Sequence, residues 1–184
     1  MKSLPSHLGG HQMIQHLDSG ALKYIQDKFG IKSLLDIGCG LGQIGKLCKE
    51  RNIKYKGIDG DYTIVRAWDV SIHDYTLGPR WHNDKEYDLA WSTEFVEHVE
   101  EQYIPNYMED FALCKYALIT YAPPNTPGHH HVNCQTQEYW FDIFSKYGFK
   151  YNDKQTQKIR EVSTMSRGNK KKFVAERGLF FEKK

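Results

Sequence analysis

A glycine-rich stretch with an acid at its front occupies residues 36–45 and reads DIGCGLGQIG. A turn so poor in side chains lets a ligand approach the polypeptide backbone closely. Dinucleotide sites use the spacing G-x-G-x-x-G, which counted from Gly38 requires a glycine at position 43, where this chain has Gln43. The stretch therefore predicts a ligand-binding turn, and its spacing disfavours a dinucleotide as the ligand.

Acidic residues gather where the hydrophobic pattern predicts strands to end, and they favour a cationic ligand. Two unit charges about 4 Å apart interact by about 4 kcal/mol at an effective dielectric of 20, which is enough to select the sign of a ligand. A pyrophosphate would be repelled, whereas sulfonium and ammonium groups would be attracted, and one carboxylate could still use the helix N-terminus after the turn. S-adenosylmethionine has this layout of charges. The acids concerned are Asp36, Asp59, Asp69, Glu94 and Glu97.

A second group of chemically active side chains combines carboxylates with imidazoles. The sequence EFVEH at residues 94–98 would place its two glutamates and His98 on one face of a helix that starts near residue 94, because positions i, i+3 and i+4 are neighbours on a helix. The sequence HHH at residues 129–131 falls in the loop after another predicted strand. Since parallel strands end at the same edge of a sheet, we expect the two loops to meet.

Three roles are open for this carboxylate and histidine group. Its mixed oxygen and nitrogen donors suit Mg²⁺ or Mn²⁺, and also Zn²⁺ or Fe²⁺. Without a metal, a histidine could take the proton from an accepting hydroxyl, and the candidates for this base are His98, His130 and His131. The third role is a helix cap within a structural hydrogen-bond network.

Strand and helix patterns alternate along the chain and predict the elements that position these groups. The alternation predicts an α/β fold, a single Rossmann-like domain in which helices cover both faces of an open parallel sheet and the ligand lies beyond the carboxyl ends of the strands. We expect strands at residues 33–37, 55–59, 65–70, 87–92 and 116–121, helices at 13–29, 44–51, 97–114 and 137–147, and strand-like pieces at 149–151 and 173–182.

The composition indicates one soluble domain spanning residues 1–184, with 40% hydrophobic and 26% charged residues. No apolar run is long enough to cross a bilayer, and the first residues lack the apolar core of a signal peptide, so we expect no membrane association. The four cysteines form no CxxC pair, which favours reduced thiols and a cytoplasmic location. Residues 1–30 would form an N-terminal helix and, with a hinge at Gly9-Gly10, a lid; a frayed terminus is the alternative.

The charge of the chain is small in sum but unevenly distributed. The net charge is +2, yet residues 146–184 hold 12 Lys and Arg against 4 Asp and Glu. This basic end could meet phosphates, or it could be a solvated pair of lysine-decorated strands. Because acids surround the expected site, a small-molecule substrate is favoured over nucleic acid.

Four motifs, taken in their order, resemble the class I S-adenosylmethionine-dependent methyltransferases. They are LLDIGCGLG at residues 34–42, GID at 57–59, WDV at 68–70 and WSTEFVEHVEE at 91–101. The resemblance covers the chain from about residue 31 to its C-terminus. It implies a mostly parallel sheet of seven strands with a C-terminal antiparallel strand, and S-adenosylmethionine as the cofactor.

The resemblance also implies a role for each residue of the cofactor site. Asp59 would accept hydrogen bonds from both ribose hydroxyls, a task that suits a carboxylate. Asp69 would accept from the adenine amino group, while the Val70 N–H would meet a ring nitrogen. Around the methionine part, the glycine turn would give close backbone approach and a buried acid would lie near the ammonium. The remaining residues of this implied site are Asp36, Gly38, Cys39, Gly40, Gly60 and Ser92.

The motif E-x-x-E-H with a downstream histidine resembles two narrower groups, the enzymes that 2′-O-methylate small-RNA 3′ ends and the ubiquinone-pathway O-methyltransferases. In both, the group holds a divalent metal that orients the accepting hydroxyl. The resemblance implies as ligands here Glu94, Glu97, His98 and one of His129–His131, with His131 as the candidate. We therefore expect an enzyme that methylates a hydroxyl oxygen of a small molecule or sugar, with metal assistance by Mg²⁺ or Mn²⁺. The alternatives are an RNA-terminus 2′-O-methyltransferase, an S-adenosylmethionine-binding protein without catalysis, and a nicotinamide-dependent oxidoreductase.

Overall fold

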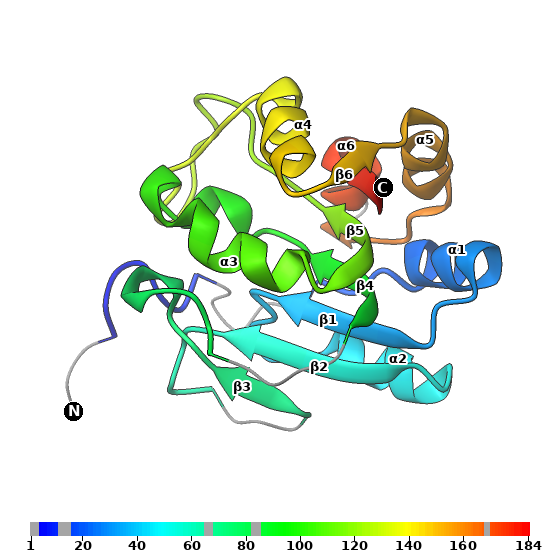
Figure 1. Cartoon of the computed structure of the whole chain (residues 1–184), viewed down its shortest axis with the longest axis horizontal. Coiled ribbons are helices and arrows are strands. Elements are labelled where there is room, and N and C mark those ends of the chain that lie inside the picture. Colours follow the sequence, from blue (N-terminus) through cyan, green and yellow to red (C-terminus); the bar gives the residue numbers. More distant parts are fainter. Residues whose placement is uncertain (1–3, 11–15, 65–67, 82–85, 168–169) are drawn as a thin grey trace.

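The computed structural model describes residues 4–10, 16–64, 68–81, 86–167 and 170–184. Its centre is a seven-stranded sheet in the order β3-β2-β1-β4-β5-β9-β6, beside a separate hairpin of β7 and β8 (Figure 1). Strands β3 to β5 in this order pair in parallel, and β9 is antiparallel to both of its neighbours. The predicted fold class is confirmed. The strands are β1 Ser33–Ile37, β2 Lys54–Asp59, β3 Val70–Ile72, β4 Tyr87–Ser92, β5 Cys114–Ile119, β6 Phe149–Tyr151, β7 Ser166–Arg167, β8 Lys170–Lys171 and β9 Leu179–Lys183.

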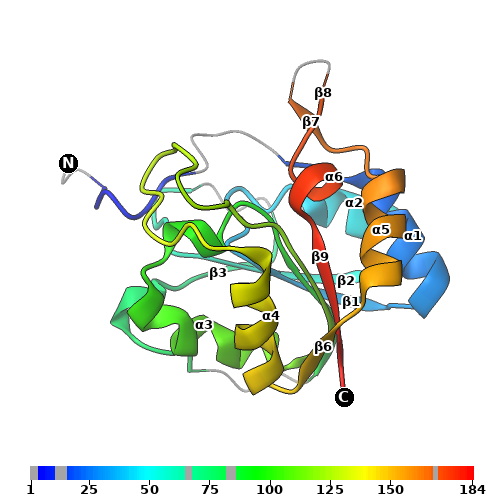
Figure 2. The same cartoon turned by 90° about the horizontal axis from the view of Figure 1, so that it is seen from above.

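Helices cover both faces of the sheet, as Figures 1 and 2 show from two directions. Helices α3 and α4 pack on one face in one buried apolar cluster, and α1, α2, α5 and α6 pack on the other face in a second cluster. The helices are α1 Ser19–Phe29, α2 Ile44–Glu50, α3 Ile104–Phe111, α4 Gln137–Lys146, α5 Asp153–Val162 and α6 Val174–Arg177, with 3-10 turns η1 Tyr75–Leu77, η2 Val96–His98 and η3 Glu101–Tyr103.

The central strands are buried on both faces because their side chains alternate between the two clusters. In β1, Leu34 belongs to one cluster and Leu35 to the other; in β4, Leu89 and Ala90 divide in the same way, and all four are fully buried. Burial on both sides fixes the register of these strands. Their carboxyl ends therefore meet at one edge of the sheet, where the loops that follow them come together.

The first helix begins later than the pattern predicts. Residues 13–29 were expected to be helical, whereas α1 starts at Ser19 because the Asp18 side chain caps it and accepts from the Ala21 N–H at 2.8 Å. Residues 11–15 lie outside the described part of the chain. The helix ends as expected at Gly30, whose φ of 65° is left-handed. Among the helices described, none is both long and apolar enough to cross a membrane.

The third strand is shorter and lies later in the chain than predicted. The apolar residues of 65–70 suggested a strand, but residues 65–67 lie outside the described part and β3 runs from Val70 to Ile72. Its register pairs Val70 with Gly57 and Ile72 with Asp59. The carboxyl end of β3 is therefore at Ile72, and this shift changes which acid reaches the site.

Two further predictions were wrong in detail. The single helix expected at 97–114 is two 3-10 turns followed by α3, and α3 starts beside Pro105 because proline fits only the first turn of a helix. The strand expected at 173–182 is α6 followed by β9. Helix α5, between β6 and the hairpin, was not predicted; its core-facing side chains include the polar Gln155 and Thr156, which weakens the apolar periodicity.

Candidate functional site

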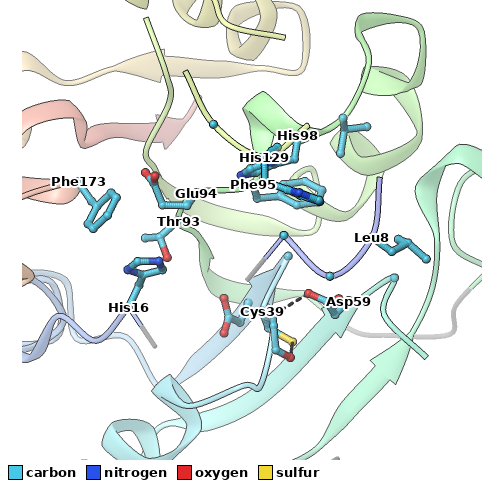
Figure 3. Close-up of a pocket in the computed structure, with 18 of the residues that line it drawn as sticks. Leu8, His16, Cys39, Asp59, Thr93, Glu94, Phe95, His98, His129 and Phe173 are labelled. Carbon is cyan, nitrogen blue, oxygen red and sulfur yellow. Dashed lines mark hydrogen bonds between the residues drawn. The ribbon is translucent and has the colours of Figure 1, made fainter. Parts of the chain in front are cut away.

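A cavity of about 570 Å³ opens at the carboxyl ends of the parallel strands (Figure 3). This volume falls within the roughly 300–1,000 Å³ typical of small-molecule sites. The glycine turn after β1 and the ends of β2 and β4 form one side. Further lining comes from the N-terminal residues 7–10, from residues 73–76 after β3, from the loop 126–131 and from the segment 172–177.

The glycine turn is held against β2 by backbone hydrogen bonds. The N–H groups of Gly38 and Cys39 both donate to the Ile58 carbonyl, at 2.9 and 3.0 Å. Gly38 has a φ of 72°, and a Cβ there would lie 2.2 Å from the ring of Phe95. Only glycine accepts this conformation and this contact together. The turn therefore presents bare backbone to the cavity, and Gly38, Cys39 and Gly40 line it as predicted.

Asp59, the last residue of β2, lies beside this turn. Its Oδ2 accepts from the Gly40 N–H at 2.6 Å, drawn as a dashed line in Figure 3, and its Oδ1 accepts from the Asp61 N–H at 2.8 Å. Asp59 thus fixes the glycine turn and lines the cavity, as does the adjacent Gly60.

Asp36 lies deeper, at the base of the turn. Its side chain is only 5% exposed, and its Oδ2 accepts from the Tyr55 hydroxyl at 3.0 Å. Burial raises the pKa of Asp36 to about 8, even though the Tyr55 hydrogen bond acts in the opposite direction. The carboxyl lines the cavity, so a cationic ligand group there would favour its ionised form.

The acid after the carboxyl end of β3 is Asp74. Asp69, which was expected to reach the adenine, lies at the other end of this strand. Asp69 precedes β3, and its exposed carboxylate pairs with Lys56 Nζ at 2.8 Å, outside the cavity lining. Val70 is buried and also outside the lining. Asp74 follows the end of β3 by two residues and lines the cavity, and the Asp59 carbonyl accepts from the His73 N–H next to it.

The structure also separates Ser92 from the cavity. Its hydroxyl is fully buried and donates to the Ile37 carbonyl at 2.8 Å, which ties the end of β4 to the end of β1. The next residue, Thr93, lines the cavity in its place (Figure 3). The prediction was therefore displaced by one position, because alternate strand residues face opposite sides.

Glu94 follows β4 in a strained backbone conformation. Its φ is 54°, a left-handed value that costs a non-glycine residue about 1–3 kcal/mol. Thr120 holds it in place: the Thr120 Oγ1 accepts from the Glu94 N–H at 2.8 Å and donates to Glu94 Oε1 at 2.9 Å. The predicted helix starting near residue 94 is thus absent, and Glu94 points into the cavity from a turn.

Three of the four predicted metal ligands come together. Glu97, His98 and His131 each offer one ligand atom, and these atoms lie within 4.8 Å of one another. Glu97 is fully buried, and neither of its carboxylate oxygens has a hydrogen-bond partner. Burial, reinforced by the carboxylate of Glu94, raises the pKa of Glu97 well above its usual range. Such an unsatisfied carboxylate is costly unless a cation or proton compensates it.

The two imidazoles of this cluster are oriented by backbone carbonyls. His98 Nδ1 lies 2.8 Å from the His129 carbonyl, and His131 Nδ1 lies 3.0 Å from the Thr126 carbonyl. A carbonyl only accepts, so each Nδ1 carries the proton and each Nε2 keeps its lone pair, the arrangement that metal-ligating histidines use. Burial and the neighbouring His131 lower the pKa of His98 to about 4, which leaves its imidazole neutral at pH 7.

His130 does not join this cluster. Its Nε2 faces Glu100 Oε1 at 3.5 Å, and it lies outside the cavity lining. Its φ of 46° turns its side chain away from the direction of His131. The His131 ring can take its position because residue 128 is a glycine: a Cβ on Gly128 would lie 2.2 Å from that ring. Of the three consecutive histidines, His131 is the one that reaches Glu97.

Several residues that line the cavity were missed by sequence reasoning. The aromatic rings of Phe95 and Phe173 and the imidazole of His16 are seen at its wall in Figure 3. Each lies in or beside a segment for which a helix or strand was expected, but the pattern of that segment did not mark these residues as part of the site. Asp74 had a usable signal, because it comes two residues after the short run VSI. Others missed include His7, Leu8, Thr93, Thr126, Lys172 and Arg177.

The chain has the fold of S-adenosylmethionine-dependent methyltransferases. It is similar to a TehB-like methyltransferase of this kind from Corynebacterium glutamicum, with 15% identity, a TM-score of 0.62, and coverage of 90% of this chain and 88% of that one. It is also similar to magnesium protoporphyrin IX methyltransferase (ChlM) from Synechocystis with bound S-adenosylhomocysteine, with 14% identity, a TM-score of 0.59, and coverage of 89% and 80%. A third is the methyltransferase domain of bacterial CtHen1, with 17% identity, a TM-score of 0.59, and coverage of 89% and 95%. No protein-family model matches the sequence, and no match is found among curated proteins.

Proposed function

We propose that this protein is an S-adenosylmethionine-dependent methyltransferase that acts on a hydroxyl oxygen of a small molecule or sugar. The observation that carries the proposal is one cavity with two chemically different ends. Asp36 in β1, Asp59 at the end of β2 and Asp74 after β3 line the end beside the glycine turn. His98 and His131 line the cavity after β4 and β5, with the buried Glu97 of their cluster behind them. Neighbouring structures of the same fold that hold S-adenosylmethionine or S-adenosylhomocysteine support the choice of cofactor.

Each acid of the first end has a role that its position supports. Asp59, at the end of β2, would accept from the ribose hydroxyls with its remaining lone pairs. Asp74 takes over the role first expected of Asp69 and would accept from the adenine amino group. Asp36 would balance the ammonium group of the methionine part. The bare backbone of Gly38 and Gly40 leaves room for that part to lie close.

The second end fits a divalent cation. Glu97, His98 and His131 would hold it, while Glu94 faces the same cavity and is held by Thr120. Mixed carboxylate and imidazole donors suit Mn²⁺ or Mg²⁺ with water or substrate in the remaining positions. When bound, such a cation lowers the pKa of a coordinated hydroxyl and fixes its position.

The protein's own contribution is alignment and exclusion of water. Methyl transfer from a sulfonium needs little covalent help, because the leaving group is already activated, so rate depends on holding the acceptor in line. Phe95 packs on Gly38 between the two ends of the cavity, and the N-terminal residues 7–10 cover the cavity. These groups exclude water from the reacting region. His98 or His131 would take the hydroxyl proton if the cation is absent.

Binding and turnover together test this proposal. We expect S-adenosylmethionine and S-adenosylhomocysteine to raise the unfolding temperature, and NAD to leave it unchanged. Formation of S-adenosylhomocysteine is then followed with a panel of hydroxyl compounds, with and without Mn²⁺ or Mg²⁺ after chelator treatment. Absence of cofactor binding would refute the proposal, and binding without turnover on any acceptor would favour a regulatory cofactor-binding protein. If chelator treatment leaves turnover unchanged, the divalent cation is no longer part of the proposed function.

A further inference from the structure

The cavity wall beside α6 carries a guanidinium group to which no role has been assigned. Arg177 ends α6, two residues before β9, and lines the cavity together with Lys172 and Phe173. Strand β9 begins beside the carboxyl end of β5, where Leu179 pairs with Ile119. In the sheet order β1-β4-β5-β9, three strand spacings of roughly 14 Å in total separate β9 from β1, the strand that the glycine turn follows.

Arg177 differs from the other arginines whose side chains are described. Arg51 bonds Gln26 and faces Asp27, Arg80 pairs with Asp110 at 2.6 Å, and Arg160 donates to the Gly178 carbonyl at 2.9 Å. Within the described residues, the guanidinium of Arg177 makes no hydrogen bond and no ion pair, although the residue is half-buried. Removing a guanidinium partly from water without a partner is costly, so a partner supplied by a ligand would offset the cost.

The charges around Arg177 leave its own charge available. Lys172 Nζ is paired with Glu176 Oε1 at 2.8 Å, so these two neighbours compensate each other. No hydrogen bond or ion pair joins Arg177 to Glu97. Glu97 belongs to the cation cluster described above. Once a divalent cation occupies that cluster, Arg177 and the cation would both attract a negatively charged ligand.

From this position we infer that the methyl acceptor carries an oxyanion, a carboxylate or a phosphate, which Arg177 binds while the hydroxyl lies at the Glu97 cluster. The inference rests on the proposed methyltransferase function and narrows its substrate class. The planar guanidinium matches both anions through two parallel N–H···O bonds. Phe173 and His16 contact each other edge to face, with ring centroids 4.5 Å apart, and wall the same end for the apolar body of the acceptor.

The distance from the glycine turn sets this group apart from the cofactor's own carboxylate. That carboxylate belongs to the methionine part, which lies at the turn after β1 in the proposed function. Arg177 precedes β9, which pairs with β5, whereas Asp36 and Asp59 lie on β1 and β2 across the sheet. Arg177 is therefore a specificity residue for the acceptor.

The test uses protein saturated with S-adenosylhomocysteine, whose binding is first measured by calorimetry. Sodium acetate and inorganic phosphate are titrated separately at constant ionic strength, and the Arg177 Nε–H resonance, assigned by its loss in Arg177→Gln, is followed by NMR. We expect a saturable shift with one of the two anions, and the anion that responds shows whether the bound group of the acceptor is a carboxylate or a phosphate. Arg177→Gln should weaken the binding of that anion at least tenfold, and Arg177→Lys should weaken it less. Lys170→Gln, which removes an exposed charge from the hairpin, should weaken it less than twofold.

Three results would overturn the inference. A resonance that shifts with neither anion shows that Arg177 has no oxyanion site. A loss of S-adenosylhomocysteine affinity in Arg177→Gln as large as the loss of anion affinity would assign the guanidinium to the cofactor instead. An equal effect of Lys170→Gln would indicate diffuse attraction by the basic hairpin. Failure of the unsubstituted protein to bind S-adenosylhomocysteine is a different result, because it refutes the proposed function itself.

Discussion

His7 Nε2 lies 2.8 Å from Asp74 Oδ2, and this contact joins the N-terminal segment to the loop that follows β3. The next residue, Leu8, packs so closely that a Cβ on Gly60 would lie 2.5 Å from its Cδ2. The segment thus lies at the acidic end of the cavity, and its action as a lid stays a prediction. A ligand that needs Asp74 must share this carboxylate with His7 or displace it.

The first prediction concerns this contact. His7→Ala should accelerate dissociation of S-adenosylhomocysteine several-fold, because the segment loses its polar attachment above the cofactor. Stopped-flow displacement measures the rate. A double-mutant cycle with Asp74→Asn should show a coupling of about 0.5–1 kcal/mol in binding free energy. Independent effects of the two substitutions would mean that the contact does not govern release.

A second prediction separates the two aspartates that compete for the adenine role. Asp74→Ala should weaken the binding of S-adenosylhomocysteine about tenfold or more, since it removes a hydrogen-bond acceptor from the cavity. Asp69→Ala serves as the matched control, because that carboxylate pairs with Lys56 outside the lining, and its affinity should stay within twofold. Calorimetry measures both. The reverse ranking would contradict the placement of the cofactor.

Glu97 supplies a third prediction, with opposite effects on stability and on metal binding. Glu97→Gln removes a buried charge that has no hydrogen-bond partner, so the chelator-treated protein should gain about 1–3 kcal/mol in unfolding free energy. The same substitution should abolish the stabilisation and the retained metal that Mn²⁺ produces in the unsubstituted protein. Glu176→Gln, on the same cavity but outside the cluster, should change neither. Equal metal content in all three proteins, measured by elemental analysis, would disprove the site.

The buried Asp36 predicts a pH dependence. Its pKa of about 8 in the folded state exceeds the value of about 3.9 in the unfolded chain, so the folded state holds the proton more tightly. The contribution of Asp36 to stability is fully present below pH 4 and is lost as the pH rises to about 8. In Asp36→Asn, the unfolding free energy should therefore fall less between pH 4 and pH 8 than it does in the unsubstituted protein. The difference between the two falls should reach several kcal/mol at the upper end of this range. Denaturant unfolding at a series of pH values measures this.

The same carboxyl should couple cofactor binding to proton release. An ammonium group near Asp36 favours its ionised form, against the burial and the nearby Asp59 that raise its pKa. Near pH 7, S-adenosylmethionine should therefore release up to one proton on binding. Calorimetry in two buffers of different ionisation enthalpy detects it. No proton release, or the same release from Asp36→Asn, would show that the ammonium lies elsewhere.

Sequence patterns predicted the elements in which burial repeats regularly. Strands β1 and β4 have the predicted bounds, because continuous apolar runs are what a sheet buried on both faces requires; the edge strand β6 has its predicted bounds as well. The glycine turn and Asp59 lie at the cavity. The carboxylate and histidine motif indicated Glu97, His98 and one of the three histidines at 129–131. The extent of a single domain over residues 1–184 stays a prediction.

Loops and short strands escaped prediction because nothing local fixes them. A three-residue strand such as β3 has no periodicity of its own, and its pairing with β2 alone decided that Asp74 and not Asp69 reaches the cavity. Likewise, Glu94 turns inward because Thr120 holds it, and Thr120 comes from the end of a neighbouring strand. Such choices depend on partners distant in the chain.

The sequence alone determined a parallel α/β sheet with a bare turn, a ring of acids and a carboxylate–histidine pair of loops, since these follow from residue type and spacing. Tertiary structure decided which histidine of 129–131 meets Glu97 and which acid follows β3, and it alone brought Arg177 to the far wall. The physical reason is that side-chain direction outside helices and strands is set by long-range hydrogen bonds and packing, and these exist only in the folded chain.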